Sequence, residues 1–174
     1  MKPRILSILA VFILLSGLSS FSWASGQKGV RSCLSSDLIG TWELRSMNTK
    51  IKIDPNDPFG WPFQRFSFDH RGDVKEMMST TPIEGNKAAI QKFENAASTS
   101  KFSLDEKGIL SVSKIESPLP ERCACTVATK DVPAEMLAKL PSSKRTQVPH
   151  QGDLVLTYMN RSGQPVIIKS LRKL

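Results

Sequence analysis

Three cysteines, Cys33, Cys123 and Cys125, are the residues of this 174-residue chain whose type and spacing most readily support chemistry. Cys123 and Cys125 are two positions apart, so in a strand they share one face, and a bond between them would be strained. We therefore expect a structural disulfide between Cys33 and either Cys123 or Cys125, with one free thiol left over. This cross-link would enclose about ninety residues and stabilise the fold by ~4 kcal/mol on the chain-entropy estimate.

Two other chemistries stay open for these sulfur atoms. Two thiolates on one strand face, joined by Met77 or Met78 or by the third cysteine, would suit Cu(I). Redox activity is the other alternative, although the sequence has no Cys-x-x-Cys motif. The first expectation remains the structural disulfide, with no metal ion and no cofactor.

Other catalytic patterns are missing from the sequence. The two histidines, His70 and His150, fall in predicted connections, where solvated side chains are expected. The chain lacks the G-x-S-x-G, H-E-x-x-H and phosphate-loop motifs. Asp54, Asp57 and Glu76 could pair for acid–base work, but their spacing does not require it. Basic and aromatic residues do not interleave as binding of single-stranded nucleic acid would need. We expect neither an enzyme nor a nucleic-acid-binding protein.

The elements that must position these residues are indicated by three short turn sequences. Residues 69–72, 105–108 and 160–163 each begin with Asp or Asn and end with Gly. A short polar side chain bonds nearby backbone at the first position, and Gly adopts the left-handed conformation at no steric cost. Polar and apolar residues alternate on both sides of each turn, which is the pattern of strands. Three hairpins, and therefore six strands, are predicted.

Two further strands complete an all-β pattern. Eight strands close into a barrel with room for side chains or one small ligand, and closure removes exposed sheet edges. The prediction is a single eight-stranded antiparallel up-and-down β-barrel with one or two short helices, at 85–97 and 132–140. The expected strands cover residues 39–47, 62–69, 73–80, 101–105, 109–115, 121–129, 153–159 and 165–172.

The strand order also predicts where a ligand would enter. In an up-and-down barrel the long connections 48–61 and 81–100 lie at the same end, which we take as the mouth. Phe59 and Trp61 in the first connection either sit at this mouth or plug the core. The candidate ligand-binding residues are Trp42, Leu44, Phe59, Trp61, Phe66, Phe68, Met78, Leu110, Val112, Leu154, Leu156 and Tyr158. On the last strand, Val166 and Ile168 are expected to face inward as well.

Gly40-Thr41-Trp42, at the start of the first strand, resembles the G-x-W signature of the lipocalin and wider calycin group. Residues 38–46 are similar to the first strand of bacterial lipocalin-like domains, and the likeness covers residues 38–174. In that family the Trp closes the narrow end of the barrel and a basic residue of the last strand packs across it. The resemblance therefore implies a closure made by Gly40, Trp42 and Arg172. The family's T-D-Y motif is absent, so the likeness is to a divergent member, and it implies small apolar ligands.

The N-terminus has the features of a secretory signal peptide. Lys2 and Arg4 precede an apolar run, and small residues at Ser22 and Ala24 predict cleavage between Ala24 and Ser25. An uncleaved anchor is the alternative, but a membrane span needs roughly 20 apolar residues and this run is shorter. The expected location is periplasmic or secreted. The predicted organisation is a signal peptide at 1–24, an N-terminal segment at 25–37 and the lipocalin-like barrel at 38–174.

Charge and core together limit the function. The signal peptide holds two of the 24 basic residues and no acid, so its removal would change the net charge from +8 to +6. This excess fits either a plain soluble surface or a peripheral contact with an anionic envelope surface. The leading hypothesis is an exported binding protein for a small apolar or amphipathic ligand inside the barrel. The alternatives are a filled barrel that acts as an envelope or protein-interaction domain, and copper handling by thiols and methionines.

Overall fold

The computed structural model describes residues 29–114 and 121–174, so the predicted signal peptide and its cleavage site after Ala24 lie outside the described residues. Within these ranges nine strands form one antiparallel sheet. They are β1 (Val30–Ser32), β2 (Gly40–Thr49), β3 (Phe63–Phe68), β4 (Asp73–Ser79), β5 (Ser100–Leu104), β6 (Ile109–Lys114), β7 (Glu121–Ala128), β8 (Leu154–Met159) and β9 (Pro165–Lys173).

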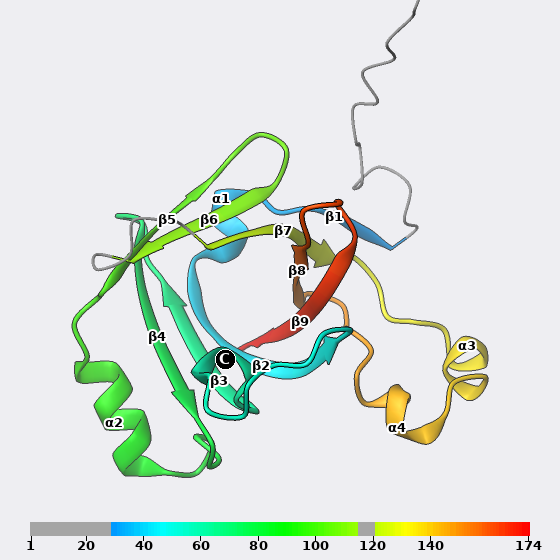
Figure 1. Cartoon of the computed structure of the whole chain (residues 1–174), viewed down its shortest axis with the longest axis horizontal. Helices are drawn as coiled ribbons and strands as arrows, with labels where there is room; N and C mark the ends of the chain where they lie inside the picture. Colours follow the sequence, from blue (N-terminus) through cyan, green and yellow to red (C-terminus); the bar gives the residue numbers. More distant parts are fainter. Residues whose placement is uncertain (1–28, 115–120) are drawn as a thin grey trace, which may run out of the picture.

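Pairing between β7 and β8 closes the sheet into a barrel. The strand order is β1-β7-β6-β5-β4-β3-β2-β9-β8, and the additional pairing joins β8 back to β7. The eight strands β2 to β9 therefore form a ring in which each is antiparallel to its neighbours, and β1 is an extra strand on β7 (Figure 1). The predicted eight-stranded up-and-down barrel is confirmed.

The three predicted turns share one hydrogen-bonding pattern. The side-chain oxygen of Asp69 accepts from the backbone N–H groups two and four residues later, at 2.8 and 2.9 Å. Asp105 and Asn160 repeat these two bonds at 2.8–3.0 Å. The glycine that ends each turn has a φ between 73° and 79°. Each turn thus satisfies its own backbone, which fixes the hairpins β3–β4, β5–β6 and β8–β9 locally.

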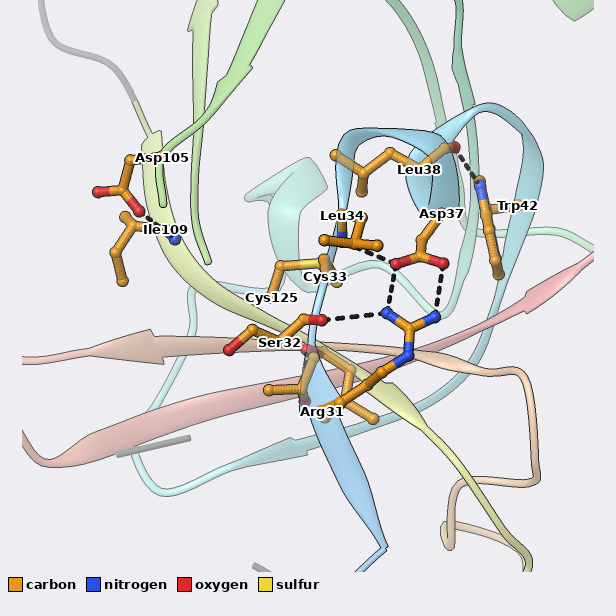
Figure 2. The surroundings of a disulfide bond; sticks show 12 residues. Arg31, Ser32, Cys33, Leu34, Asp37, Leu38, Trp42, Asp105, Ile109 and Cys125 are labelled. Atoms are coloured by element: carbon orange, nitrogen blue, oxygen red, sulfur yellow. Dashed lines mark hydrogen bonds and ion pairs between the residues drawn. A yellow bond between two sulfur atoms is a disulfide. The ribbon is translucent and has the colours of Figure 1, made fainter. Parts of the chain in front are cut away.

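The residues just before β2 pack across the end of the barrel at which β2 begins. After β1 the chain forms the short helix α1 (Ser35–Leu38), whose Leu38 is fully buried. The carbonyl of Leu38 accepts a 2.7 Å hydrogen bond from the indole N–H of Trp42 (Figure 2). Arg31 holds this turn closed because its guanidinium donates two bonds to the carboxylate of Asp37, at 2.6 and 2.7 Å. The described residues before the predicted barrel therefore belong to the fold, because β1 pairs with β7 and Leu38 of α1 is buried in the core.

A disulfide joins Cys33 to Cys125, with their Cα atoms 5.5 Å apart (Figure 2). This is one of the two pairings expected from the sequence. The backbone N–H of Cys33 also donates to the carbonyl of Cys125 at 3.1 Å, so the bond continues the pairing of β1 along β7. Cys123 is the free cysteine, and its side chain is buried inside the barrel. The disulfide uses two of the three thiols on which the copper hypothesis depended.

The predicted inner face of the last strand is wrong by one residue. Val166 and Ile168 were expected to face inward, but β9 places Ile167, Lys169 and Leu171 inside. The register explains this, because Ile167 lies opposite Tyr158 and Leu171 opposite Leu154, both on inward-facing positions. Three consecutive apolar residues at 166–168 satisfy either face, so alternation could not select between them.

The same one-residue difference corrects the predicted closure by Arg172. Lys173 lies opposite Trp42, and its ammonium lies 5.4 Å from the centre of the indole ring. Arg172 points to the outer face, where it donates to Glu43 at 2.9 Å and to Glu84 at 2.7 Å.

The ionised form of Glu43 is stabilised by these contacts on the outer face. Burial alone would raise the pKa of Glu43, but hydrogen bonds from Arg65 and Arg172 outweigh this effect and lower it.

The helices other than α1 lie outside the barrel wall in the described structure. Helix α2 (Lys87–Asn95) matches the helix predicted at 85–97 and packs beside β4, with Phe93 buried against the guanidinium of Arg65 (Figure 1). Helix α3 (Ala134–Ala138) matches the one predicted at 132–140, and α4 (Ser142–Arg145) was not predicted. A 3-10 turn, η1 (Pro58–Gly60), lies in the connection between β2 and β3. None of the described helices has the length and apolar character of a membrane span.

Replacement of the turn glycines should separate backbone strain from crowding. Gly163→Ala is expected to destabilise the fold by about 1–2 kcal/mol, because the new Cβ meets nothing within 4 Å and only the left-handed φ is strained. Gly108→Ala should cost more, because its Cβ would lie 3.1 Å from Ser32 Cβ and 3.3 Å from the Cys125 carbonyl. Urea unfolding of both variants measures this order, and equal losses would contradict the packing of β1 against the β5–β6 turn.

A thiol titration should find no reactive cysteine in the native protein and one per chain after unfolding without reductant. Cys123 is buried, and the other two cysteines are bonded to each other. Three reactive thiols in the unfolded chain would show that the bond does not form.

Removal of the disulfide should destabilise the fold. The double variant Cys33→Ala/Cys125→Ala should lose about 4.5 kcal/mol of unfolding free energy in urea unfolding, because the bond closes a loop of 92 residues.

Candidate functional site

A cavity of about 450 Å³ lies inside the barrel, toward the end where β2, β4, β6 and β8 finish. This is the end that the strand order predicted as the mouth. The lining comprises Asp57, Pro58, Phe59, Phe66, Phe68, Glu76, Met78, Leu110, Val112, Lys114, Glu121, Arg122, Cys123, Leu156, Tyr158 and Lys169. The barrel is therefore hollow at one end.

The opposite half of the barrel is filled with side chains. Leu38, Trp42, Val74, Leu154 and Leu171 are each at most 2% exposed and belong to one continuous core. None of these five residues lines the cavity. The packed half forms a floor beneath the hollow half, and it holds the strands at fixed spacing.

Eight of the twelve predicted ligand-binding residues line the cavity. The strands contribute Phe66, Phe68, Met78, Leu110, Val112, Leu156 and Tyr158, and the connection between β2 and β3 contributes Phe59. The other four lie elsewhere. Trp42 and Leu154 belong to the packed floor, Leu44 packs against the core, and Trp61 turns back on its own loop to donate to the Pro55 carbonyl at 3.1 Å.

The connection between β2 and β3 covers part of the mouth. Asp57 begins η1 by accepting the N–H of Phe59 at 2.9 Å. The ring of Phe59 then packs edge to face on Tyr158, with the ring centres 5.0 Å apart. Gln64, which is fully buried, donates to the carbonyls of Phe59 and Trp61, both at 2.8 Å. The buried Gln64 side chain therefore fixes the loop to the barrel wall through these hydrogen bonds, and Phe59 forms part of the cavity wall.

Lys169 is the most deeply buried of the cavity residues that the sequence analysis missed; the others are Pro58, Lys114, Glu121 and Arg122. Its side chain is 1% exposed, and its ammonium donates to Gln64 Oε1 at 2.8 Å and to the Phe59 carbonyl at 3.1 Å. The same nitrogen lies 3.4 Å from the centre of the Phe59 ring. Burial lowers the pKa of Lys169 from 10.5 to about 8. Once the inner face of β9 is known, the sequence places Lys169 between Ile167 and Leu171 on that face.

A second polar group forms the rim of the cavity. Lys114 donates to Glu121 at 2.8 Å and lies 3.9 Å from the carboxylate of Glu76. Burial raises the pKa of Glu76 above its ordinary value, and Lys114 partly offsets this rise. Of the carboxylates considered from sequence, Asp57 and Glu76 both line the cavity, but Asp57 is occupied in capping η1.

Cys123 and Tyr158 are neutral members of the cavity wall. Burial raises the pKa of the Cys123 thiol to about 12 and also raises that of the Tyr158 hydroxyl. A thiol that stays protonated at neutral pH is a weak nucleophile and a weak metal ligand. Neither of the two histidines is part of the cavity. No group of three or more His, Cys, Asp or Glu side chains is placed to hold a metal ion in the part of the chain that the structure describes.

The barrel wall has one weakly paired seam beside the cavity. Strands β3 and β4 share six residue pairs, whereas β4 and β5 share only two, at Asp73–Lys101 and Val74–Ser100. Glu76 and Met78 lie on the part of β4 beyond these pairs. The cavity therefore borders the neighbouring strands of the ring that share the fewest residue pairs among the described residues.

Comparison with known proteins identifies no relative. The chain matches no protein-family model, no curated protein and no solved structure. The resemblance to lipocalin-like domains thus rests on its own residues, and the arguments about function rest on the cavity.

The titration of Lys169 should be visible in the stability of the protein. Its pKa is about 8 in the folded chain and 10.5 when exposed, so between these pH values the unfolded chain holds more protons. This difference makes the unfolding free energy rise with pH from about 8 to 10.5, by about 3 kcal/mol in total. The contribution should be absent from Lys169→Met.

Urea unfolding of the parent and of Lys169→Met, each at pH 7 to 11, measures this contribution as the difference between the two curves. The comparison is needed because Cys123 and Tyr158 also titrate in alkaline solution. Lys139→Met, at an exposed position after α3, is the control that should run parallel to the parent. Parallel curves for Lys169→Met as well would mean that Lys169 is not buried in solution.

Proposed function

We propose that this protein binds a small amphipathic molecule inside its barrel. The observation that carries the proposal is the cavity of about 450 Å³, which lies above a packed floor. Its volume falls within the range of roughly 300–1,000 Å³ that is typical of small-molecule sites. A barrel that acts only through its surface does not need an interior space of this size.

The composition of the wall supports an amphipathic rather than a purely apolar ligand. Aromatic and aliphatic side chains of β3, β6 and β8 supply apolar surface, including Phe66, Val112 and Leu156. Lys169 and Glu76 add charged groups on β9 and β4. Binding sites of this kind combine an apolar lining with a few polar groups that orient the ligand.

The disulfide supports action outside the cytoplasm. Bonds such as Cys33–Cys125 form and persist in oxidising compartments and are rare where thiols are kept reduced. Together with the predicted signal peptide, this supports a periplasmic or secreted carrier. The resemblance of Gly40-Thr41-Trp42 to the lipocalin signature is in agreement with the same role.

Titration with a neutral fluorescent probe, N-phenyl-1-naphthylamine, tests the proposal on the mature chain. We expect saturable binding of one probe per chain, with an increase in fluorescence as the probe leaves water. Val112→Trp should weaken this binding at least tenfold, because the indole would occupy space that Val112 leaves open in the cavity.

The matched control is Ser113→Trp, which adds the same side chain at the next position of β6, on the exposed outer face. It should bind the probe as the parent does. Equal binding by both variants and the parent would place the probe outside the barrel and contradict the proposal. If the probe binds inside the barrel, native mass spectrometry of protein purified from its export compartment would identify any organic ligand that is retained.

A further inference from the structure

Lys169 carries a buried charge that has no counter-ion among the described residues. Its nitrogen contacts two neutral oxygens, those of Gln64 and the Phe59 carbonyl, together with the Phe59 ring. No carboxylate in residues 29–114 or 121–174 lies within 4.0 Å of it. Transfer of an ammonium group into a protein interior without a partner of opposite charge is strongly unfavourable. Neutral acceptors and an aromatic face offset only part of that cost.

The acids that line the cavity are engaged at its rim. Glu121 is hydrogen-bonded to Lys114, and Glu76 lies 3.9 Å from the same ammonium. Asp57 caps η1 at the mouth and is exposed. Each of these carboxylates therefore makes its direct contact with a group other than Lys169, although the single charge of Lys114 is shared between Glu121 and Glu76.

The remaining titratable groups around the cavity do not supply a negative charge at neutral pH. Cys123 and Tyr158 have pKa values raised by burial, so both stay protonated. Arg122 is exposed at the rim and adds a further positive charge. Among the described residues no carboxylate thus contacts the Lys169 ammonium, while the charges of Glu121, Glu76 and Asp57 act on it from a longer distance.

We infer that the molecule bound in this cavity carries a carboxylate, which accepts a hydrogen bond from the Lys169 ammonium while its apolar chain contacts Phe66, Met78 and Val112. The inference rests on the proposed function, since it names the chemical class of the ligand for the same cavity. A carboxylate is preferred to a phosphate because a single lysine balances one negative charge and a phosphate carries up to two.

Binding of such a ligand must be linked to the protonation of Lys169. A carboxylate beside the ammonium raises the pKa of Lys169 from about 8, because an opposite charge favours the charged form. The free protein loses this proton as the pH rises through about 8, so the affinity for the carboxylate should fall by up to tenfold for each further pH unit. The carboxylate itself is ionised throughout this range. An uncharged ligand of the same length should show no such dependence.

Displacement of N-phenyl-1-naphthylamine by octanoate and by 1-octanol compares a charged and a neutral head group on one chain length. At pH 7 we expect both to displace the probe. Lys169→Met should weaken octanoate by about 10- to 100-fold and leave 1-octanol within about threefold. The control Lys139→Met removes an exposed lysine that does not line the cavity, so octanoate affinity should change less than threefold.

Two further measurements keep the inference testable if Lys169→Met does not fold. In the parent protein, octanoate affinity should fall between pH 8 and pH 10 while 1-octanol affinity stays constant. Glu76→Gln removes a carboxylate whose charge acts on Lys169 across the cavity, and it should strengthen octanoate only.

The outcomes separate this inference from the proposed function. Octanoate and 1-octanol affinities that are both independent of pH and of Lys169 would overturn the carboxylate inference and leave the ligand-binding barrel intact. Displacement by 1-octanol alone would also overturn it. Failure of the probe and of both displacers to bind the folded parent would overturn both.

Discussion

Strand β7 closes the sheet into a barrel by pairing with three other strands. This strand pairs with β6 through Glu121–Ala124, with β8 through Ala124–Val127 and with β1 through Thr126–Ala128. Because the ring is closed, each strand has one inner and one outer face, and a shift of one residue would exchange all of its side chains between them. Closure therefore decides which residues form the core, which line the cavity and which contact α2. It also leaves few unpaired edges, and β1 covers part of the free edge of β7 beyond the β5–β6 turn.

The interior that closure creates is divided between a packed floor and a hollow mouth. The floor is made by large apolar side chains and is sealed from below by Leu38, whose carbonyl holds the Trp42 indole. The disulfide ties this seal to β7, so the short helix α1 cannot separate from the barrel without stretching the strand that closes it. Above the floor the wall is less complete, since β4 and β5 share only two residue pairs. A rigid base beneath a looser rim is an arrangement that lets a site keep its shape while a ligand enters.

Polar groups inside the hollow half connect its structure to its proposed role. Lys169 and Gln64 are buried together, and both bond to the Phe59 carbonyl, so they fix the loop that forms part of the mouth. The same lysine supplies a positive charge that no described carboxylate contacts. One residue thus has a structural and a ligand-directed role, and the two are linked because the Phe59 ring lies against the ammonium. Binding of an anion at Lys169 would be expected to change the contacts of this loop as well.

Features that depend on residues close together in the chain could be predicted from the sequence. The three turns follow from Asp69, Asp105 and Asn160, whose side chains bond backbone groups two and four residues away. The eight strands follow from alternation, and the choice of Cys33 with Cys123 or Cys125 follows from the strain of the remaining pair. Three features became visible only in the folded chain. Cys33 bonds to Cys125 and not to Cys123, β1 adds to β7 as a ninth strand, and the side chain of Lys169 lies inside the barrel. A strand of three residues has too few positions to show a period, and the apolar run 166–168 fits either face of a sheet. The cavity could not be foreseen for a related reason, because an interior volume depends on how side chains from eight strands fit together and not on any one of them.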